Sequence, residues 1–286
     1  MSAQLLDGKT LALRILAEAR RRAAKVMSRR GRAPRLAIVA AADASAGSYL
    51  KAKLKACADA GVDVVVHRLS PGPREKTLGL LADLAADVQA DALIVETPYP
   101  RGLTAADTAA AIPPNKDAEG ITPGAYGLLF LTKSWKDIEN LVVPCTALAL
   151  ARLALAAGIP LSGRRAVVVG RSATVGRPTA HLLSTLDMTV TLAHSRTKGL
   201  ASLCREADIL VLAAGAPGLV KASWVKRGAV ILDAGVNIVR GRLTGDAAPG
   251  VAARAGRLTP VPGGVGPVTT ACAVLNAVLL AERRAR

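Results

Sequence analysis

Residues 166–178, AVVVGRSATVGRP, are the stretch of this chain that most clearly indicates a fold. The first four residues are apolar and mostly β-branched, which is typical of a buried strand in a parallel sheet. Gly170 interrupts the pattern, and Gly176 and Pro178 stand where a helix would begin. Such a turn directs unpaired backbone N–H groups and the positive end of a helix dipole at an anion. The stretch therefore predicts a phosphate-binding turn, with an ordinary tight turn as the alternative, because its glycine spacing is not GxGxxG.

The next predicted strand suggests which nucleotide would bind. Residues 188–193, MTVTLA, are followed by a short polar segment that contains Ser195 and Arg196. In NAD-selective Rossmann domains an acidic residue at this place holds the ribose 2′-hydroxyl. Here a hydroxyl and a guanidinium replace it, and Arg171 lies in the first turn. Because arginine forms forked, charge-assisted hydrogen bonds with phosphate, these residues favour NADP, and a basic loop without a ligand is the alternative.

Length and composition limit the class of protein. The chain has 286 residues, 51% of them hydrophobic, so it can bury a substantial core, and its length favours two domains. We see no apolar run of the roughly 20 residues that a membrane span needs. Residues 1–26 form a basic amphipathic pattern without the features of a signal peptide. We therefore expect no membrane partner.

The net charge of +17 is compatible with nucleic-acid binding. Only 2% of the residues are aromatic, however, which leaves few side chains for base stacking. The Lys and Arg residues are also scattered over many predicted helices. We interpret the charge as a solvated basic surface that favours anionic small molecules, and we expect no nucleic-acid partner.

The four cysteines, Cys57, Cys145, Cys204 and Cys272, are far apart and form no CxxC pair. Their spacing indicates buried thiols in a reducing, cytoplasmic compartment. The three histidines are equally isolated, so the sequence suggests no metal site.

Strand-like and helix-like stretches alternate along nearly the whole chain. This alternation predicts an α/β protein with mainly parallel sheets, whose ligands lie outside the carboxyl ends of the strands. A domain boundary is expected near Pro144, which follows a polar patch and precedes a helix. We expect strands at residues 36–40, 62–69, 92–95, 166–169, 189–193, 209–213, 230–234 and 258–260, and helices at 48–60, 77–88, 146–157, 177–186, 200–207 and 268–286.

Two polar positions in the first half of the chain suggest proton chemistry. Tyr49 and Lys53 are four residues apart on a predicted helix, so both project from one face, where a phenol and an ammonium can share hydrogen bonds. A solvated lysine face is the alternative. Glu96 ends the predicted strand at 92–95 and is followed by TPYP. A strand-end carboxylate stands where α/β enzymes place ligands, although it could equally point into water.

The order of these motifs, together with KDAEG at residues 116–120, DAGVN at 233–237 and TPVPGGVGP at 259–267, resembles the bifunctional methylenetetrahydrofolate dehydrogenase/cyclohydrolase family. The resemblance runs from LLDGK at residues 5–9 to the last helix. It implies a folate-binding catalytic domain at 1–143 and a Rossmann-type NADP-binding domain at 144–267. It further implies that the helix at 268–286 packs back on the first domain, that the active-site cleft lies between the domains, and that the protein is a homodimer.

The resemblance also implies roles for single residues. Tyr49 matches the tyrosine that stacks on the folate, and Lys53 matches the lysine needed for methenyl hydrolysis. Asp117 and Glu119 lie in the loop whose second acidic residue binds the amino edge of the pterin. The loop that contains Pro262, Gly263 and Gly264 would close over the folate. The residues that match NADP contacts are Gly170, Arg171, Ser172, Ser195 and Val236, and we add Arg196.

The implied reaction is oxidation of 5,10-methylenetetrahydrofolate with NADP, then hydrolysis of the methenyl product to 10-formyltetrahydrofolate, a precursor supply for purines. Two residues depart from the family pattern: Glu96 replaces a glutamine, and Glu119 replaces an aspartate. Glu96 puts a potential anion beside Lys53, so we list Lys53, Tyr49 and Glu96 as catalytic candidates. Alternatives are a dehydrogenase with weak cyclohydrolase activity, another two-domain NADP oxidoreductase, and a silent relative that still binds folate.

Overall fold

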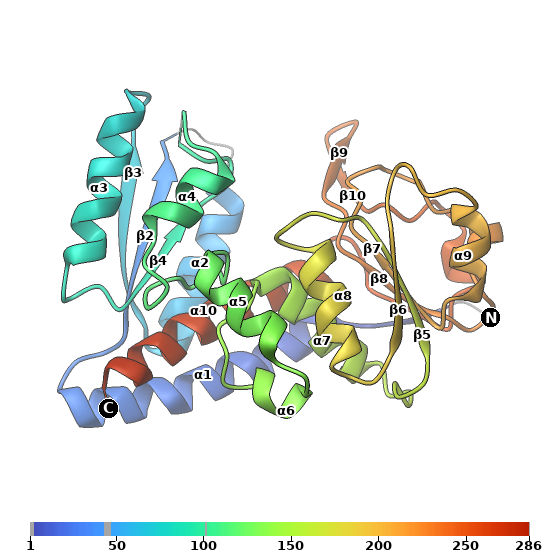
Figure 1. The fold of residues 1–286 in the computed structure, drawn as a ribbon, viewed down its shortest axis with the longest axis horizontal. Helices are drawn as coiled ribbons and strands as arrows, with labels where there is room; N and C mark the ends of the chain where they lie inside the picture. Colours follow the sequence, from blue (N-terminus) through green and yellow to red (C-terminus); the bar gives the residue numbers. More distant parts are fainter. Residues whose placement is uncertain (1–2, 43–46, 101, 286) are drawn as a thin grey trace. The chain divides into compact units, whose positions relative to one another are not determined.

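The computed structural model describes residues 3–42, 47–100 and 102–285, which form two compact units (Figure 1). We call them the three-stranded unit and the six-stranded unit and describe each by itself. The three-stranded unit contains Leu13–Leu131, Ile138–Cys145 and Thr270–Arg286. The six-stranded unit contains Met1–Ala12, Thr132–Asp137 and Thr146–Thr269.

A parallel sheet with the order β3-β2-β4 organises the three-stranded unit. Its strands are β2 (Arg35–Ala41), β3 (Asp63–Leu69) and β4 (Ala92–Val95). The chain passes from β2 to β3 through α2 (Gly47–Ala60), and from β3 to β4 through α3 (Arg74–Ala86). All four residues of β4 are buried, which matches their unbroken apolar sequence.

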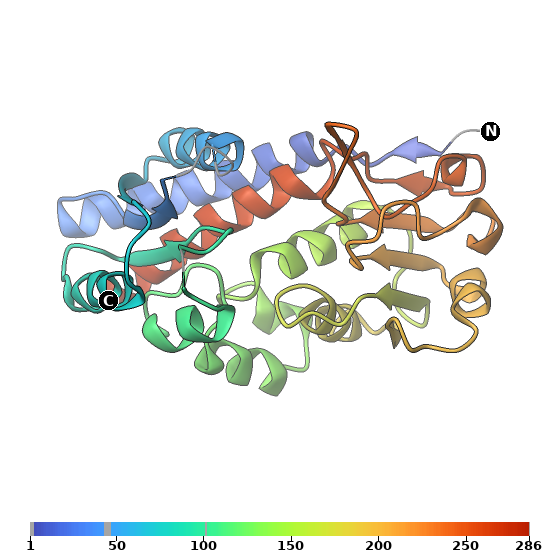
Figure 2. The same ribbon diagram turned by 90° about the horizontal axis from the view of Figure 1, so that it is seen from above.

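Two long helices complete this unit, namely α1 (Gly8–Arg30) and α10 (Val265–Arg284). Their segments within the unit lie side by side in both ribbon views (Figures 1 and 2), and Arg22 of α1 pairs with Glu282 of α10 at 2.9 Å. By length and apolar composition alone, α10 is the one helix among the described residues that could cross a membrane. However, 72% of its apolar window is buried inside the protein, as in the core helix of a soluble protein.

Short helices follow β4 along the chain. They are α4 (Ala105–Ala111), α5 (Pro123–Leu131) and α6 (Trp135–Ile138), and α7 (Cys145–Ala156) comes next. The sequence analysis did not predict α4, α5 and α6, because they are too short to show a clear helical period. Between α4 and α5 lies the loop at residues 113–122, which carries KDAEG.

The six-stranded unit contains a sheet with the order β1-β11-β8-β7-β5-β6, in which every pairing is parallel. Its central strands are almost wholly buried, so their apolar runs predicted them well. Two-residue β1 was not predicted; it pairs with β11 and so assigns the start of the chain to this unit. The strands are β1 (Gln4–Leu5), β5 (Arg165–Val169), β6 (Thr189–Ala193), β7 (Ile209–Leu212), β8 (Val230–Asp233) and β11 (Arg257–Leu258).

The helices α8 (Gly176–Ser184) and α9 (Leu200–Glu206) connect β5 to β6 and β6 to β7. After β8 the chain forms an antiparallel hairpin of β9 (Asn237–Val239) and β10 (Arg242–Thr244), which the sequence analysis did not predict. The last helix begins at Val265, three residues earlier than expected, and Arg286 lies outside the described residues.

Candidate active site

Lys53 and Glu96 form a buried ion pair in the three-stranded unit. Nζ of Lys53 donates a hydrogen bond to Oε1 of Glu96, and the two residues are only 9% and 8% exposed. Glu96 follows β4 directly, and its N–H bonds to the Val39 carbonyl of β2 at 2.8 Å. The carboxylate is therefore anchored at the carboxyl end of the sheet, and it does not point into water.

Helix α2 explains why only one of its lysines reaches this site. Lys51 and Lys55 lie on either side of Lys53 in sequence and are exposed, whereas Lys53 faces inward. The alternative of a solvated lysine face is therefore wrong for Lys53. Tyr49 lies one helical turn before Lys53 and is 47% exposed, so its ring remains accessible to a ligand.

The loop at residues 113–122 brings a second carboxyl group, Glu119, to this pair. The loop extends β4, because Leu93 exchanges backbone hydrogen bonds with Lys116 and Ala118 on either side of Asp117. Glu119 is partly exposed, and its carboxylate accepts a hydrogen bond from the Val95 N–H.

Asp117 shapes this loop from the inside. The residue is fully buried, and its carboxylate accepts hydrogen bonds from the N–H groups of Glu119, Gly120 and Thr122 at 3.1, 2.8 and 2.7 Å. The Asp117 carboxylate thus stabilises the turn, and it has no exposed surface at which a ligand could bind. Of the two acidic residues that the resemblance implied for the folate, Glu119 is the one with access.

Electrostatics couple the three ionisable groups of the site. Burial raises the pKa of Glu119 to about 7; Lys53 opposes this shift, and Glu96 and Asp117 add to it. Burial lowers the pKa of Lys53, but Glu96 and Glu119 outweigh it, so the pKa lies above the ordinary value for lysine. Lys53 is therefore an ammonium ion at neutral pH, whereas Glu119 is near its titration midpoint.

Two residues that the sequence analysis did not assign hold the Glu119 loop in place. Asn276 of α10 is fully buried, and its Nδ2 donates to the carbonyls of Ala118 at 2.9 Å and Val143 at 3.0 Å. The Cys145 thiol also donates to the Ala118 carbonyl, at 3.3 Å. Gly120 has a φ of +69°, and a Cβ there would lie 2.3 Å from the carbonyl carbon of Val143. No sequence signal marked Asn276, since it lies in an apolar helix far from the loop.

Two tyrosines were also missed, Tyr99 from the segment after Glu96 and Tyr126 from α5. Burial and then the charge of Glu119 raise the pKa of Tyr99. Burial, followed by Asp117, Tyr99 and Glu119, raises the pKa of Tyr126 to about 12. Both phenols are therefore neutral at physiological pH and can donate hydrogen bonds near the Glu119 carboxyl group.

The predicted phosphate-binding turn in the six-stranded unit joins β5 to α8. Gly170 has a φ of +131°, and a Cβ there would lie 2.1 Å from the carbonyl oxygen of Ala213 after β7. The Ser172 hydroxyl accepts hydrogen bonds from the N–H groups of Val175 and Gly176 at 3.1 and 3.2 Å. Ser172 thereby shapes the turn, and Arg171 beside it is exposed.

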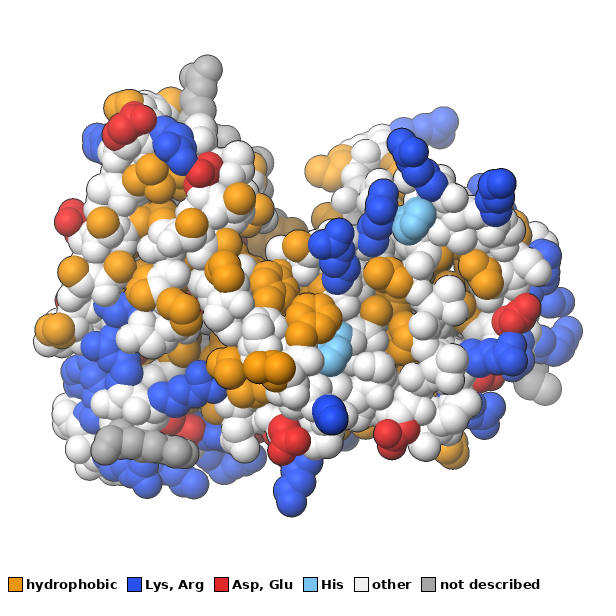
Figure 3. Space-filling model, viewed as in Figure 1, with side chains coloured by type: hydrophobic (Ala, Val, Ile, Leu, Met, Phe, Trp, Pro, Cys, Tyr) orange, Lys and Arg blue, Asp and Glu red, His pale blue; other side chains and the backbone are white. Residues whose placement is uncertain are grey.

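The segment after β6 forms a second preformed turn. The N–H of His194 bonds to the Thr197 hydroxyl at 2.8 Å, and the Arg196 N–H bonds to Nδ1 of His194 at 3.2 Å. Ser195 and Arg196 are exposed on this turn. Because β5 and β6 are adjacent parallel strands, the turns that carry Arg171 and Arg196 lie at the same edge of the sheet. Figure 3 shows Lys and Arg side chains gathered around a histidine on this unit.

Further polar contacts order the neighbouring loops at this edge. The buried Asp246 carboxylate accepts hydrogen bonds from the N–H groups of Ala214, Gly215 and Ala216 after β7, at 2.7 to 3.0 Å. Val236 is 60% exposed after β8. The close approach at Gly170, the exposed arginines and these ordered loops fit a phosphorylated dinucleotide such as NADP.

The loop with Pro262, Gly263 and Gly264 belongs to the same unit. It is tied to the start of the chain, because the Gly8 N–H bonds to the Gly263 carbonyl at 3.1 Å. The Gly264 N–H bonds to the Pro260 carbonyl at 2.8 Å, which closes the turn. The role in folate binding that the resemblance implied for these residues stays a prediction.

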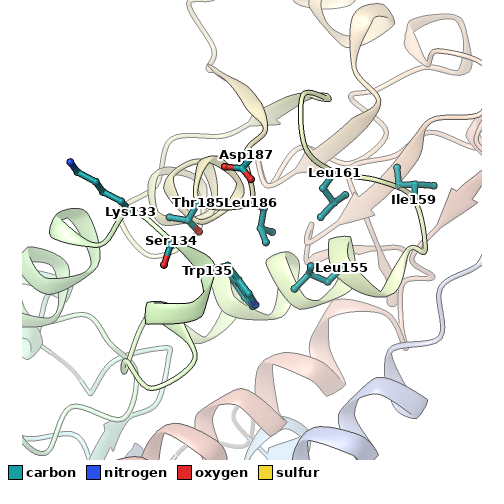
Figure 4. A pocket seen from close by; sticks show the side chains of 9 residues that line it. All are labelled: Lys133, Ser134, Trp135, Leu155, Ile159, Leu161, Thr185, Leu186 and Asp187. Atoms are coloured by element: carbon teal, nitrogen blue, oxygen red, sulfur yellow. The ribbon is translucent and has the colours of Figure 1, made fainter.

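A separate hollow of about 450 Å³ in the six-stranded unit lies away from the cofactor turns (Figure 4). Leu161 precedes β5, and residues 185–187 precede β6, so the hollow lies at the amino ends of strands whose carboxyl ends carry Arg171 and Arg196. Figure 4 shows Lys133 pointing away from the other lining side chains. Asp187 is the other charged residue of the lining, and we assign the hollow no role.

Comparisons with known proteins agree with this geometry along the whole chain. Residues 6–119 match the model of the tetrahydrofolate dehydrogenase/cyclohydrolase catalytic domain, and residues 144–285 match the model of the NAD(P)-binding domain. This chain belongs to the tetrahydrofolate dehydrogenase/cyclohydrolase family. The membership sets aside a different type of two-domain NADP oxidoreductase.

Individual members of the tetrahydrofolate dehydrogenase/cyclohydrolase family are similar over their full length. The bifunctional protein FolD 2 of Frankia alni is 41% identical over 288 residues, which cover all of this chain and 98% of that protein. The bifunctional FolD of Campylobacter jejuni has a TM-score of 0.91 at 33% identity, with 99% of this chain and 100% of that chain covered. The Trypanosoma brucei enzyme, solved with NADP and an inhibitor, has a TM-score of 0.90 at 34% identity and covers 100% of this chain and 99% of that one.

Proposed function

We propose that this enzyme oxidises 5,10-methylenetetrahydrofolate to 5,10-methenyltetrahydrofolate with NADP and then hydrolyses the methenyl group to give 10-formyltetrahydrofolate. The observation that carries the proposal is the buried pair of Lys53 and Glu96 with Glu119 beside it, in a chain that matches both family domains.

The dehydrogenase step needs positioning more than acid or base catalysis. NADP, held by the turns after β5 and β6, would supply the hydride acceptor for the bridging methylene group of the folate, whose loss of hydride leaves a delocalised methenyl cation. Tyr49 has an exposed ring on which a flat ligand can stack, and Glu119 has a carboxyl group that can pair with ring N–H donors. These residues fix the orientation of the folate, which is the main requirement for this step.

The cyclohydrolase step needs proton transfer. Water adds to the methenyl carbon, one proton leaves, and a carbon–nitrogen bond opens as the formyl group forms. Lys53 and Tyr49 are our candidates for moving these protons. Because Glu96 holds Lys53 in its protonated form, Lys53 is a poorer proton acceptor than a lysine beside a neutral amide. We therefore propose a bifunctional enzyme whose hydrolysis step has its pH optimum above neutral.

NADP is the cofactor, and we propose that Arg171, Ser195 and Arg196 select it over NAD. All three are exposed on the two turns at the carboxyl edge of β5 and β6. A 2′-phosphate carries negative charge that guanidinium groups bind through paired hydrogen bonds, whereas a ribose hydroxyl lacks that charge.

We also propose that the protein is a cytoplasmic homodimer that supports purine precursor supply. All four cysteines are buried and none of them forms a disulfide, as suits a reducing compartment. The β9–β10 hairpin presents Ile238 and Val239, which are 81% and 40% exposed. An exposed apolar hairpin with free strand edges is a surface that a second copy could cover.

One mixing experiment tests the reaction. The protein, NADP and methylenetetrahydrofolate are combined, and absorbance is followed at the bands of reduced nicotinamide and of methenyltetrahydrofolate. We expect the nicotinamide band to rise with turnover and the methenyl band to rise transiently, then fall as hydrolysis proceeds. No rise in either band would contradict the proposed function.

A further inference from the structure

The site in the three-stranded unit contains one ammonium group and two neighbouring carboxyl groups. Lys53 balances the charge of Glu96 directly, through a hydrogen bond between nearly buried side chains. We propose that Glu119 carries a proton in the free enzyme below neutral pH and that binding of a folate expels this proton to solution. This inference rests on the proposed function, because it takes a folate as the ligand.

The surroundings of Glu119 explain why this carboxyl group holds a proton. The groups that face it from other elements are Lys53 of α2, Glu96 after β4, Tyr99, Tyr126 of α5 and Cys145 of α7. Only Lys53 is a cation, and it is already paired with Glu96.

Asp117 adds a further negative charge from within the loop of Glu119. Two carboxyl groups beside one buried cation do not both ionise easily. Repulsion between the carboxylates and the cost of desolvation favour the neutral form of the carboxyl group that is not paired with the cation. The shift of the Glu119 pKa to about 7 agrees with this charge count.

The loop cannot relieve this repulsion by moving away. Asn276 and Cys145 hold the Ala118 carbonyl, and Asp117 binds the backbone N–H of Glu119 itself. The carboxyl group is therefore kept beside Lys53 and Glu96 while it remains partly exposed to a ligand. Because the backbone is held in this way, ligand binding changes the protonation of Glu119 and not the position of the loop.

A folate supplies what the free site lacks. Its pterin ring presents an amino group and an adjacent ring N–H, which together can donate two hydrogen bonds to one carboxylate. Hydrogen bonds to the charged form lower the pKa of a carboxyl group, and the cationic methenyl ligand acts in the same direction. Binding therefore selects ionised Glu119, and the proton passes to the buffer.

The size of the effect follows from the titration of the free enzyme. If the pKa of Glu119 falls from about 7 to well below 6 on binding, each ligand releases about 0.9 proton at pH 6 and about 0.1 at pH 8. Only the ionised fraction of the free enzyme accepts the ligand, so the affinity should be roughly tenfold weaker at pH 6 than at pH 8.

Calorimetric titration with tetrahydrofolate tests the inference directly. Binding heats are measured at pH 6 and pH 8, each in two buffers whose ionisation enthalpies differ strongly, so that their difference counts the protons released. We expect nearly one proton at pH 6 in the wild type. The Glu119→Gln variant should release almost none, and Glu75→Gln, which changes an exposed carboxylate on α3, should behave like the wild type.

A second variant keeps the test independent of how Glu119→Gln folds. Glu96→Gln leaves Lys53 to pair with Glu119, which would then be ionised before the ligand arrives. Proton release at pH 6 should therefore fall well below the wild-type value. Tight binding with the same heat in both buffers would overturn the inference, and so would undiminished release in Glu119→Gln or Glu96→Gln. Absence of any binding by the wild type would instead contradict the proposed function.

Discussion

Lys53 and Glu96 are 43 residues apart in sequence, yet the ammonium of one donates a hydrogen bond to the carboxylate of the other in a nearly buried site. Helix α2 supplies the lysine, and the end of β4 supplies the glutamate. Buried ion pairs of this kind hold both groups in their charged forms, and removing one partner leaves an unbalanced charge. This relationship decides how the site handles protons.

Replacing Glu96 by glutamine should raise cyclohydrolase activity relative to dehydrogenase activity at neutral pH. In the folate complex Glu119 binds the pterin ring, so the neutral amide at position 96 leaves Lys53 without its paired carboxylate and makes the lysine a better proton acceptor. Both rates should be measured for the wild type and Glu96→Gln from about pH 6 to 9, the range around neutral pH in which general acid–base catalysis is compared. If hydrolysis falls while the dehydrogenase rate is kept, Glu96 itself is the general base and the ion-pair account is wrong.

Replacing Arg171 by alanine should weaken NADP binding by roughly 10- to 150-fold, which corresponds to about 1.5–3 kcal/mol for one charge-assisted contact. The measurement is kcat/KM with NADP and with NAD. NAD use should change little, because that cofactor lacks the 2′-phosphate. Arg227→Ala, an exposed arginine just before β8, serves as the control for a general loss of positive charge. Equal use of both cofactors by the wild type would rule out the assignment.

Replacing Asn276 by alanine should destabilise the protein and loosen the Glu119 loop. The change leaves the buried carbonyls of Ala118 and Val143 without their donor, and an unsatisfied buried acceptor costs about 1–3 kcal/mol. Urea unfolding gives the loss of stability, and the KM for the folate reports on the loop. The matched control is Asn115→Ala, an exposed asparagine at the start of the same loop. Equal unfolding midpoints for the two variants would contradict a stabilising role of the Asn276 hydrogen bonds.

Replacing Gly170 by alanine should disrupt the cofactor turn. The added Cβ would lie 2.1 Å from the Ala213 carbonyl oxygen in a backbone conformation that only glycine adopts easily. We expect loss of NADP binding and a lower unfolding temperature. Gly79→Ala in α3, where a Cβ meets nothing within 4 Å, should instead raise stability by about 0.5–1 kcal/mol. An unchanged Kd for NADP in Gly170→Ala would show that the turn tolerates displacement.

The raised pKa of Glu119 also predicts how folding stability depends on pH. In the folded state Glu119 keeps its proton up to about pH 7. In the unfolded chain a glutamic acid side chain loses its proton near the ordinary pKa of 4.5. The stabilising contribution is therefore complete below pH 4.5 and is lost as the pH rises through about 7. Urea unfolding of the wild type and Glu119→Gln between these values should show a pH-dependent difference. Parallel curves would mean that Glu119 titrates normally.

The sequence alone determined the main strands and their parallel character. Continuous apolar runs such as residues 166–169 and 209–212 are long enough to be recognised without tertiary contacts, because each must be buried on both faces of a sheet. Short elements such as β1 and α6 were not predicted, because two to four residues cannot show a helical or strand periodicity of hydrophobic residues. The motif order also carried the family resemblance, which the matches to both domain models confirmed.

Only the tertiary structure decided which candidate residues meet and in what state. The i, i+4 spacing placed Tyr49 and Lys53 on one face of a helix, but it could not tell that one would be exposed and the other buried against Glu96. The sequence also grouped Asp117 with Glu119, whereas the fold turns Asp117 inward and leaves Glu119 accessible. Burial and the sum of neighbouring charges are properties of groups brought together from distant segments, so no local pattern can specify the pKa of Glu119.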